Sequence, residues 1–330
     1  MVLNWAKDLA LGAVSVVSSK LDFRLDEIIE FFAEDHKYAH LMKVDGLSTL
    51  SKHNAERCES SIFDEYGYQW KLVYFQRGKG SNKNVSLYVE MEDAESLPAN
   101  RSILVDLHFF IISQSGLAWL PRDYNNAYFN SSNSMRGIAN WKSFELLSMG
   151  KFLVNDSLVV GFEIKNMKRG STRGVPRPVG TTECLRLIEK PRNNKFTWKI
   201  TKFSTFKQTT HHSNPVVVGQ REWVITMYPN GAMDGHGNSL SVYLKPIGYI
   251  QDAPMASTLG KITLRALNQL DDDEDLEYPF VHSFGPSSLG FGESQFLPFT
   301  SLYDESSGFL VNDVIYIGVE FHVISVTEDL

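Results

Sequence analysis

Apolar and polar residues alternate along short segments of the chain from about residue 40 onward. Residues 84–91 and 103–109 each place apolar side chains on one face and mostly polar side chains on the other. A period of two is that of a β-strand with one buried face. Segments rich in Gly, Asn and Ser, such as residues 77–82 and 130–134, separate these stretches. The pattern predicts an all-β chain built from antiparallel sandwiches.

One apolar stretch occurs twice in the chain. Residues 152–164 (FLVNDSLVVGFEI) reappear as residues 309–321 (FLVNDVIYIGVEF), with the string Phe-Leu-Val-Asn-Asp unchanged. Matches upstream keep the same order, since residues 70–75 resemble 223–228 and residues 86–90 resemble 241–245. Collinear matches of this kind indicate a repeated unit. We therefore expect two sandwiches in tandem.

The first 36 residues follow a different period. Leu21, Leu25, Ile28 and Phe32 recur at helical spacing, with acidic residues elsewhere. This pattern predicts a short helical segment with one apolar face. We expect the helix to dock on the domain that follows it. The alternative is a short coiled coil that joins copies of the chain into a homo-oligomer, although the segment is short for that structure.

A second interpretation of the N-terminus is a secretory signal peptide. Residues 9–17 form an apolar run of suitable length for the core of such a signal. However, Lys7 before the run is offset by Asp8, and no convincing cleavage site follows it. We therefore expect a helical extension here.

The two repeats are joined by a segment of unusual composition. Residues 168–180 contain three glycines, two prolines and four basic residues, a composition that resists regular structure and stays solvated. We interpret it as a linker, with a nuclear signal or a lipid-binding patch as alternatives. The predicted organisation is an N-terminal helical extension, a first domain, a basic linker and a second domain, at residues 1–37, 38–167, 168–193 and 194–326.

Composition and charge narrow the class of protein. With 43% hydrophobic residues, the 330-residue chain can build proper cores. Its net charge of −7 argues against a nucleic-acid-binding protein. No run reaches the roughly 18–20 apolar residues that span a bilayer. Cys58 and Cys184 occupy unmatched repeat positions, which suits a reducing compartment rather than a disulfide framework. We expect a cytoplasmic or nuclear protein.

The chain lacks the sequence patterns of common catalytic and metal sites. It contains no G-x-S-x-G, H-E-x-x-H, phosphate-loop or C-x-x-C motif. His211, His212 and His236 lack acidic or cysteine partners at metal-ligand spacing. The acidic run at residues 271–275 lacks the glycine of a calcium loop. We therefore expect no enzyme activity, no metal and no cofactor.

Several motifs of the second repeat resemble those of the MATH (meprin and TRAF homology, or TRAF-like) domain family. Residues 196–204 (FTWKITKFS) resemble the family's opening W-x-I-x-x-F-S strand. The G-x-x-W strand, the Y-P-x-G turn, the L-S-L-Y-L strand, the G-F-x-x-F segment and the G-[FY]-L-V-[ND]-D turn follow in order. The first repeat matches more loosely, with Met42 in place of the opening tryptophan. The tandem arrangement resembles a group of plant MATH proteins.

The resemblance implies a binding function. MATH domains typically hold a short extended peptide of a partner in a shallow groove on one face of the sandwich. The family's groove positions that are aromatic in members recognising Ser/Thr-rich segments fall here on Asn84, Leu107, Tyr128, Arg136 and Ile138, and on Ser239, Leu264, Phe291 and Glu293. The remaining position of the second repeat is Ser283, which Phe280 and Phe284 flank. Only Tyr128 and Phe291 remain aromatic. This departure implies that the two grooves take different peptides or that one is vestigial.

The resulting hypothesis is a non-enzymatic interaction protein that binds short linear peptide motifs of other proteins. Family members often deliver partners to ubiquitin ligases or deubiquitinases, so an adaptor role in ubiquitin-dependent pathways is implied. The alternative is a secreted or vacuolar protein that recognises carbohydrate or extracellular ligands. The glycosylation sequons at Asn84, Asn100, Asn130 and Asn155 would suit that alternative, but an Asn- and Ser-rich chain contains about that many by chance.

Overall fold

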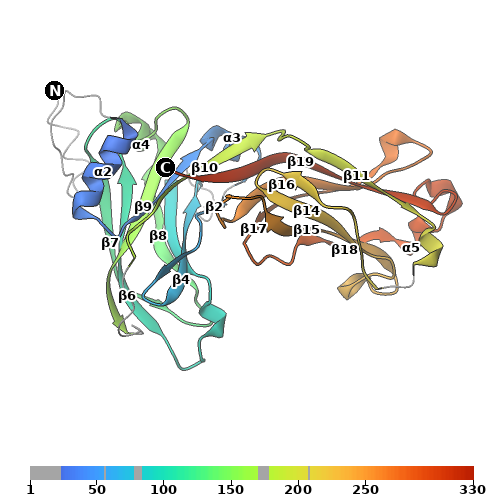
Figure 1. Cartoon of the computed structure of the whole chain (residues 1–330), viewed down its shortest axis with the longest axis horizontal. Helices are drawn as coiled ribbons and strands as arrows, with labels where there is room; N and C mark the ends of the chain where they lie inside the picture. Colours follow the sequence, from blue (N-terminus) through green and yellow to red (C-terminus); the bar gives the residue numbers. More distant parts are fainter. Residues whose placement is uncertain (1–23, 56, 78–83, 170–177, 207–208) are drawn as a thin grey trace. The chain divides into compact units, whose positions relative to one another are not determined.

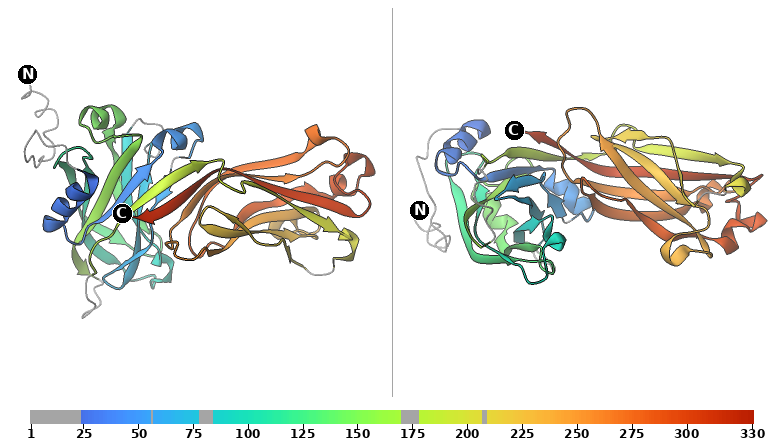
Figure 2. Two further views of the ribbon diagram at one scale, coloured as in Figure 1. Left: turned by 45° about the horizontal axis from the view of Figure 1, so that its top comes forward. Right: turned by 60° about the horizontal axis from the view of Figure 1, so that its bottom comes forward.

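The computed structural model describes residues 24–55, 57–77, 84–169, 178–206 and 209–330, and the chain divides into two compact units (Figure 1). Unit 1 extends to Arg186 and includes Thr327–Leu330, and unit 2 is Leu187–Val326. Both units consist mainly of β-strands arranged in two layers (Figure 2). The prediction of an all-β chain with two sandwiches and a short N-terminal helix is confirmed.

Unit 1 contains two sheets. One has the strand order β7-β6-β9-β1-β10, and the other has the order β2-β4-β5-β8 with β3 also paired to β4. The strands are β1 His40–Asp45, β2 Arg57–Glu59, β3 Phe63–Glu65, β4 Tyr68–Phe75, β5 Asn84–Met91, β6 Ile103–Ile112, β7 Trp119–Phe129, β8 Met135–Ser143, β9 Ser157–Arg169 and β10 Thr182–Glu189. The helices are α2 Leu25–Asp35, α3 Leu47–Lys52, α4 Phe144–Met149 and the 3₁₀ turn η1 Ala94–Ser96.

Unit 2 repeats this topology. Its sheets have the orders β17-β16-β19-β11 and β12-β14-β15-β18, with β13 also paired to β14. The strands are β11 Lys195–Thr201, β12 His211–His212, β13 Val216–Val218, β14 Arg221–Tyr228, β15 Ser239–Tyr249, β16 Thr258–Ala266, β17 Leu276–Phe284, β18 Phe291–Pro298 and β19 Val314–Asp329. The helices are α5 Phe299–Leu302 and the 3₁₀ turns η2 Phe203–Thr205, η3 Met233–Gly235, η4 Asp272–Glu274 and η5 Glu305–Ser307.

The core of each unit is centred on one tryptophan that links the two sheets. Trp70 of β4 meets Phe129 of β7 with ring centroids 5.1 Å apart, and Trp223 of β14 meets Phe284 of β17 at 4.9 Å. Both pairs are edge-to-face, the geometry that aromatic quadrupoles favour. All four side chains are buried.

The repeated Phe-Leu-Val-Asn-Asp string forms a tight turn in both units. The central residues of the turn, Asn312 and Asp313, have φ angles of 51° and 61°, as a two-residue hairpin with the twist of its strands requires. The Asp313 carboxylate accepts hydrogen bonds from the Ser204 amide and hydroxyl, both at 2.8 Å. In unit 1, Asp156 accepts the same pair from Ser48 at 2.9 and 2.6 Å. The repeated aspartate therefore ties the turn to the segment that follows the first strand of the unit.

Helix α2 packs its apolar stripe against the β7-β6-β9 sheet. Ile28 and Phe32 are 1% exposed, and the Phe32 ring lies 4.8 Å from Phe110 and 5.3 Å from Trp119. The docking expected for the amphipathic segment is thus seen for Leu25–Asp35. The remaining part of that segment, including Leu21 and the apolar run at residues 9–17, lies outside the described residues.

The expected linker at residues 168–193 needs a correction. Thr182–Glu189 forms strand β10, which pairs in parallel with β1. Cys184, Leu185 and Leu187 on this strand are buried, and this burial stabilises the strand. Residues 170–177, which carry two of the three glycines and two of the four basic residues that suggested a linker, lie outside the described residues.

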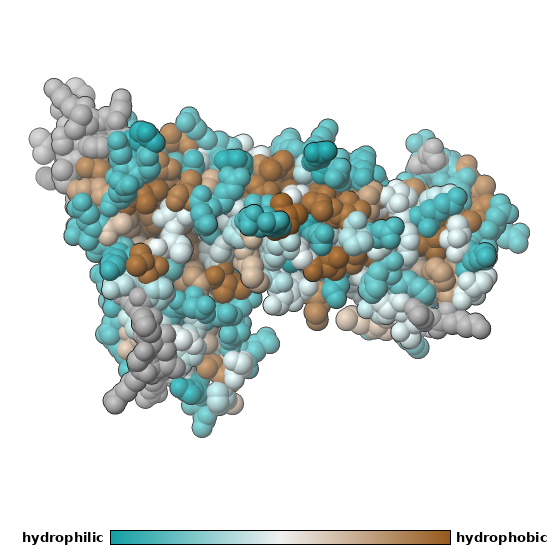
Figure 3. Space-filling model, in the orientation of Figure 1, coloured by the Kyte–Doolittle hydropathy of each residue, from teal (hydrophilic) through white to brown (hydrophobic). Residues whose placement is uncertain are grey.

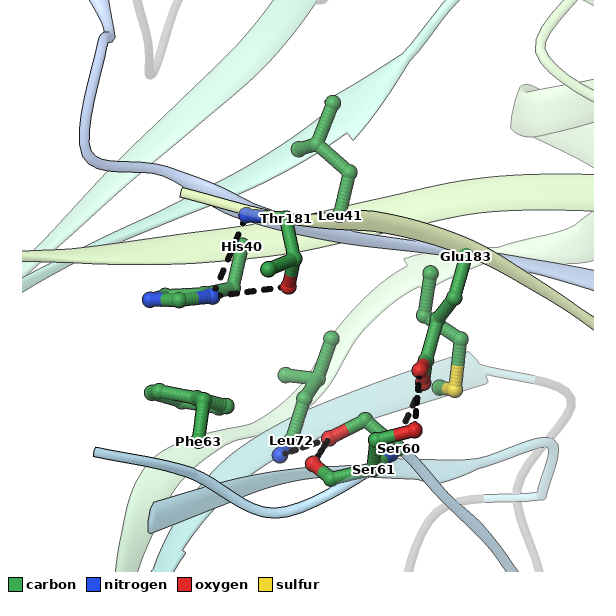
Figure 4. Close-up of a pocket in the computed structure, with 9 residues that line it drawn as sticks. His40, Leu41, Ser60, Ser61, Phe63, Leu72, Thr181 and Glu183 are labelled. Atoms are coloured by element: carbon green, nitrogen blue, oxygen red, sulfur yellow. Dashed lines mark hydrogen bonds between the residues drawn. The ribbon is translucent and has the colours of Figure 1, made fainter. Parts of the chain in front are cut away.

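Glu183 of β10 reaches the β2–β3 segment of the other sheet (Figure 4). Glu183 is 5% exposed and accepts hydrogen bonds from the Ser61 amide at 2.9 Å and the Ser61 hydroxyl at 2.5 Å. Across a small cavity, the His40 ring stacks on Phe63 and its Nδ1 lies 3.0 Å from the Thr181 hydroxyl. These contacts join β10 and the first residue of β1 to the β2–β3 segment, so we interpret the cavity as structural.

We expect Asp313→Ala to lower the free energy of unfolding of unit 2 by about 1–3 kcal/mol, because two charge-assisted hydrogen bonds are lost. Urea unfolding, monitored by hydrogen exchange of peptides from residues 196–206, measures this loss. Asn312→Ala is the matched control, since it places alanine at a similar positive φ without removing these bonds. Equal losses in the two variants would contradict the role assigned to the carboxylate.

We expect Glu183→Gln to stabilise unit 1 at pH 7. Burial raises the pKa of Glu183 above its usual range, so its ionised form is disfavoured in the folded state. The resulting loss of folding stability is absent below the ordinary glutamate pKa. It grows as the pH rises through the raised pKa of the folded state. The glutamine keeps an acceptor for the Ser61 amide. The difference in melting temperature between variant and wild type should therefore shrink as the pH is lowered towards 4. A glutamine variant less stable than wild type at pH 7 would refute this expectation.

Candidate functional site

Each sandwich has one edge where the last strands of its two sheets run beside each other, each with one side not hydrogen-bonded to another strand. In unit 1 these are β7 and β8, which lie at the ends of their sheets and are joined by residues 130–134. In unit 2 they are β17 and β18. An edge strand has a row of backbone N–H and C=O groups without a neighbour. Such a row can pair with an added extended peptide.

The edge of unit 2 carries a cluster of half-buried rings. Tyr278, Phe280 and His282 alternate along β17 and are neither buried nor fully exposed. The Phe291 ring of β18 stacks on His282 with centroids 4.3 Å apart and lies 5.0 Å from Phe280. These four residues and Glu293 are called the aromatic edge below.

Glu293 gives the aromatic edge a negative charge. Its Oε1 accepts hydrogen bonds from the Gln295 amide at 2.9 Å and the Ser294 hydroxyl at 3.3 Å. Burial raises the pKa of the Tyr278 phenol, and the adjacent Glu293 carboxylate, its hydrogen-bond partner, raises it further. Tyr278 thus remains a protonated hydrogen-bond donor at neutral pH.

The edge of unit 1 has a different chemistry. Tyr128 of β7 is 43% exposed, and the Arg136 guanidinium of β8 lies over its ring at 5.5 Å. Further along the same two strands, Lys142 lies close enough to Arg122 for their charges to interact. Burial lowers the pKa of the Lys142 ammonium, and the positive charge of Arg122 lowers it further. These four residues and Tyr124 are called the basic edge.

The residues suggested by the family resemblance are only partly brought together. Tyr128 and Arg136 are in contact on the basic edge, and Phe291 and Glu293 share one face of β18. Asn84 lies at the start of β5, where its amide donates to the Asn140 carbonyl at 3.4 Å.

Four of those residues have little or no exposed surface. Leu107 and Leu264 are 0% exposed core residues, and Ile138 and Ser239 are 9% and 4% exposed. Leu107 and Leu264 therefore cannot contact a peptide directly, which corrects their assignment to the grooves. They are also not equivalent, because Leu107 pairs with Ile164 whereas Leu264 pairs with Val319, the counterpart of Phe162.

The sequence reasoning missed several residues on the two edges, namely Arg122, Tyr124, Lys142, Tyr278 and His282, and treated Phe280 only as a neighbour of Ser283. Tyr278, Phe280, His282 and Phe284 alternate with other residues, so a strand with one aromatic face was detectable. The position of that strand at an edge was not, because it depends on pairing between distant segments.

The apolar surface seen in one view of the described residues does not mark a further binding site. On the face drawn in Figure 3, polar residues interrupt the apolar patches, and such scatter is usual for soluble surfaces. Among the residues that the structure describes, no group of three His, Cys, Asp or Glu side chains is arranged to hold a metal ion. None of the described helices is long and apolar enough to cross a membrane.

Comparison with known proteins gives a match to each unit. The family model described as MATH domain matches residues 39–164 and 195–321. Ubiquitin C-terminal hydrolase 12 of Arabidopsis thaliana is 32% identical over 152 residues, which are 45% of this chain and 13% of the hydrolase. A MATH domain and coiled-coil domain-containing protein of the same plant is 32% identical over 139 residues, 41% of this chain and 40% of that protein.

The chain therefore covers less than half the length of each of these relatives. Among solved structures, the TRAF5 protein of Notothenia coriiceps is similar with a TM-score of 0.32 and 19% identity. The aligned region covers 39% of this chain and 73% of that structure.

Proposed function

This chain belongs to the MATH domain family, whose domains are protein-interaction modules, and we propose from this that it binds short extended segments of partner proteins along the β7/β8 and β17/β18 edges. The observation that carries the proposal is the half-buried ring cluster of Phe280, His282 and Phe291 beside an unpaired strand edge. The expected family membership, based on the repeated motifs, is confirmed.

Two physical features of the edges support peptide binding. The open strand provides backbone hydrogen bonds without regard to sequence, and side-chain pockets beside it provide specificity. Aromatic rings that are already held by their neighbours lose little conformational freedom when a ligand packs on them, and such residues often dominate the binding energy. Phe291 is held in this way by His282 and Phe280.

We further propose that the chain acts as a non-catalytic adaptor in the cytoplasm or nucleus. The region shared with ubiquitin C-terminal hydrolase 12 is a small part of that enzyme, which fits a partner-binding module shared between proteins of ubiquitin-dependent pathways. Cys58 and Cys184 are both free and buried, and burial raises the pKa of each thiol. Inert thiols of this kind suit a reducing compartment.

We expect Phe291→Ala to weaken binding of peptides selected on unit 2 by at least about tenfold, the effect of losing one hot-spot ring. Peptides displayed from a random octamer library are selected on the purified chain, and their dissociation constants are measured by fluorescence polarisation. Tyr316→Ala is the matched control, because Tyr316 is a half-buried aromatic residue on β19 that contacts Lys199 instead of the edge.

Tyr128→Ala serves as the corresponding variant for unit 1. Melting temperatures within a few degrees of wild type would show that both variants remain folded. If every selected peptide binds both variants with unchanged affinity, the two edges are not the binding sites.

A further inference from the structure

The two edges differ in charge at equivalent positions. Gly137 and Gly292 occupy the same place in β8 and β18, opposite Tyr88 and Tyr243. The residues that precede these two glycines are therefore equivalent to each other. They are Arg136 in unit 1 and Phe291 in unit 2.

A second pair of positions shows the same change. Arg122 pairs with Phe109 of β6, and Phe109 pairs with Phe162 of β9. Tyr278 pairs with Leu264 of β16, and Leu264 pairs with Val319, the counterpart of Phe162. Arg122 thus stands where unit 2 has Tyr278. Two aromatic positions of the aromatic edge are arginines on the basic edge.

The cations of the basic edge have no anionic partner among the described residues. Neither arginine nor Lys142 lies within 4.0 Å of a described carboxylate, and Arg136 donates only to its neighbour's backbone, the Met135 carbonyl, at 2.8 Å. The three acidic residues on these strands or on the strands paired with them are already engaged, and Asp106 of β6 lies 2.8 Å from Lys168. Asp123 lies 2.5 Å from His108 and 3.3 Å from Lys165, and Glu90 is bound by Arg57 and Lys71.

These observations leave three cations without a compensating charge, and two of them, Arg136 and Lys142, are neither buried nor fully exposed. A positive charge in that setting gains energy from an anionic ligand, because the ligand replaces the lost hydration and both charges interact in a region of reduced dielectric. Arginine also matches the two oxygens of a carboxylate or phosphate group with two parallel hydrogen bonds. Tyr124, which lies on the same face of β7 as Arg122, adds ring surface for the backbone and apolar atoms of the same ligand.

Building on the proposed function, we propose that the basic edge selects extended peptide segments that carry anionic side chains, whereas the aromatic edge selects segments without them. The anionic group is a carboxylate of Asp or Glu or a phosphate on Ser or Thr. On the aromatic edge, Glu293 repels such groups and the rings of Phe280, His282 and Phe291 receive apolar or aromatic side chains.

The test selects octamers from a random displayed library on two variants of the full chain. Phe291→Ala weakens the aromatic edge, so its selected peptides report on the basic edge. Arg122→Gln/Arg136→Gln weakens the basic edge, so its peptides report on the aromatic edge. Lys195→Gln/Lys199→Gln removes the same amount of charge from β11 and serves as the matched control.

We expect peptides selected on Phe291→Ala to be enriched in Asp and Glu, and peptides selected on the double arginine variant to lack that enrichment. The best acidic peptide is then synthesised with Glu, with phosphoserine and with Gln at the same positions. Replacement by Gln should weaken binding at least about tenfold, and the ratio of the Glu and phosphoserine affinities identifies the preferred anion. The lysine control should bind the acidic peptide like wild type.

The outcomes separate the two proposals. If neither variant nor wild type enriches any peptide, the proposed function fails. If peptides are enriched on Phe291→Ala without an excess of acidic residues, or if the Gln peptide binds as tightly as the Glu peptide, peptide binding stands and the charge selection is overturned. Enrichment on the aromatic edge alone also overturns it.

Discussion

The contact between one tryptophan and one phenylalanine across the two sheets is the constraint on which each sandwich depends. Trp70 and Trp223 are fully buried, and their indole N–H groups donate to the backbone carbonyls of Glu65 and Val218 at 2.9 and 3.1 Å. The large apolar area of the indole is therefore buried without an unpaired polar group. Truncating such a residue typically costs about 3–5 kcal/mol, a large part of the stability of one domain.

The phenylalanine of this contact also positions the edge that we propose to bind peptides. Phe129 and Phe284 are the last residues of β7 and β17, so each pair fastens the end of an edge strand to the opposite sheet. On the neighbouring strand, a side chain at Gly137 or Gly292 would bring its Cβ to 2.1 or 2.2 Å from a backbone carbonyl oxygen of β5 or β15. Only glycine permits this close approach, which brings β8 and β18 onto their sheets. The buried aromatic pair and the glycine thus fix the positions of the edge strands. Other residues on these strands can differ between the two units.

The difference between repeated core positions and variable edge positions explains which features the sequence could predict. The period-two alternation and the repeated strings mark strands, turns and core, and the positions of Trp70, Trp223, Asp156 and Asp313 repeat because their contacts repeat. Strand β10 was not anticipated, since the basic and Gly-rich composition before it suggested a linker throughout.

The candidate site was harder to predict because it depends on strand register. Leu107 and Leu264 are 157 residues apart, the offset of the repeated Phe-Leu-Val-Asn-Asp string. The strand pairing instead makes Leu107 equivalent to Ile262, 155 residues away. Tyr278 and Arg122 were missed for a related reason. Their importance follows from lying on edge strands beside β18 and β8, and no local pattern records which strands are at the edge.

Arg136 occupies the position that is Phe291 in unit 2, and the structure changes how this difference between the repeats is interpreted. Viewed as a departure from an aromatic position, an arginine suggests a lost anchor and a vestigial groove. In the folded protein its guanidinium lies over the Tyr128 ring, so the remaining aromatic residue supports a cation, an arrangement that is favourable at partly exposed sites. The Tyr128 ring can therefore orient the Arg136 charge. The two units thus repeat a core but differ in charge at their edges, and the residues that break the repeat, such as Arg136 and Phe291, are those on which the proposed peptide preferences rest.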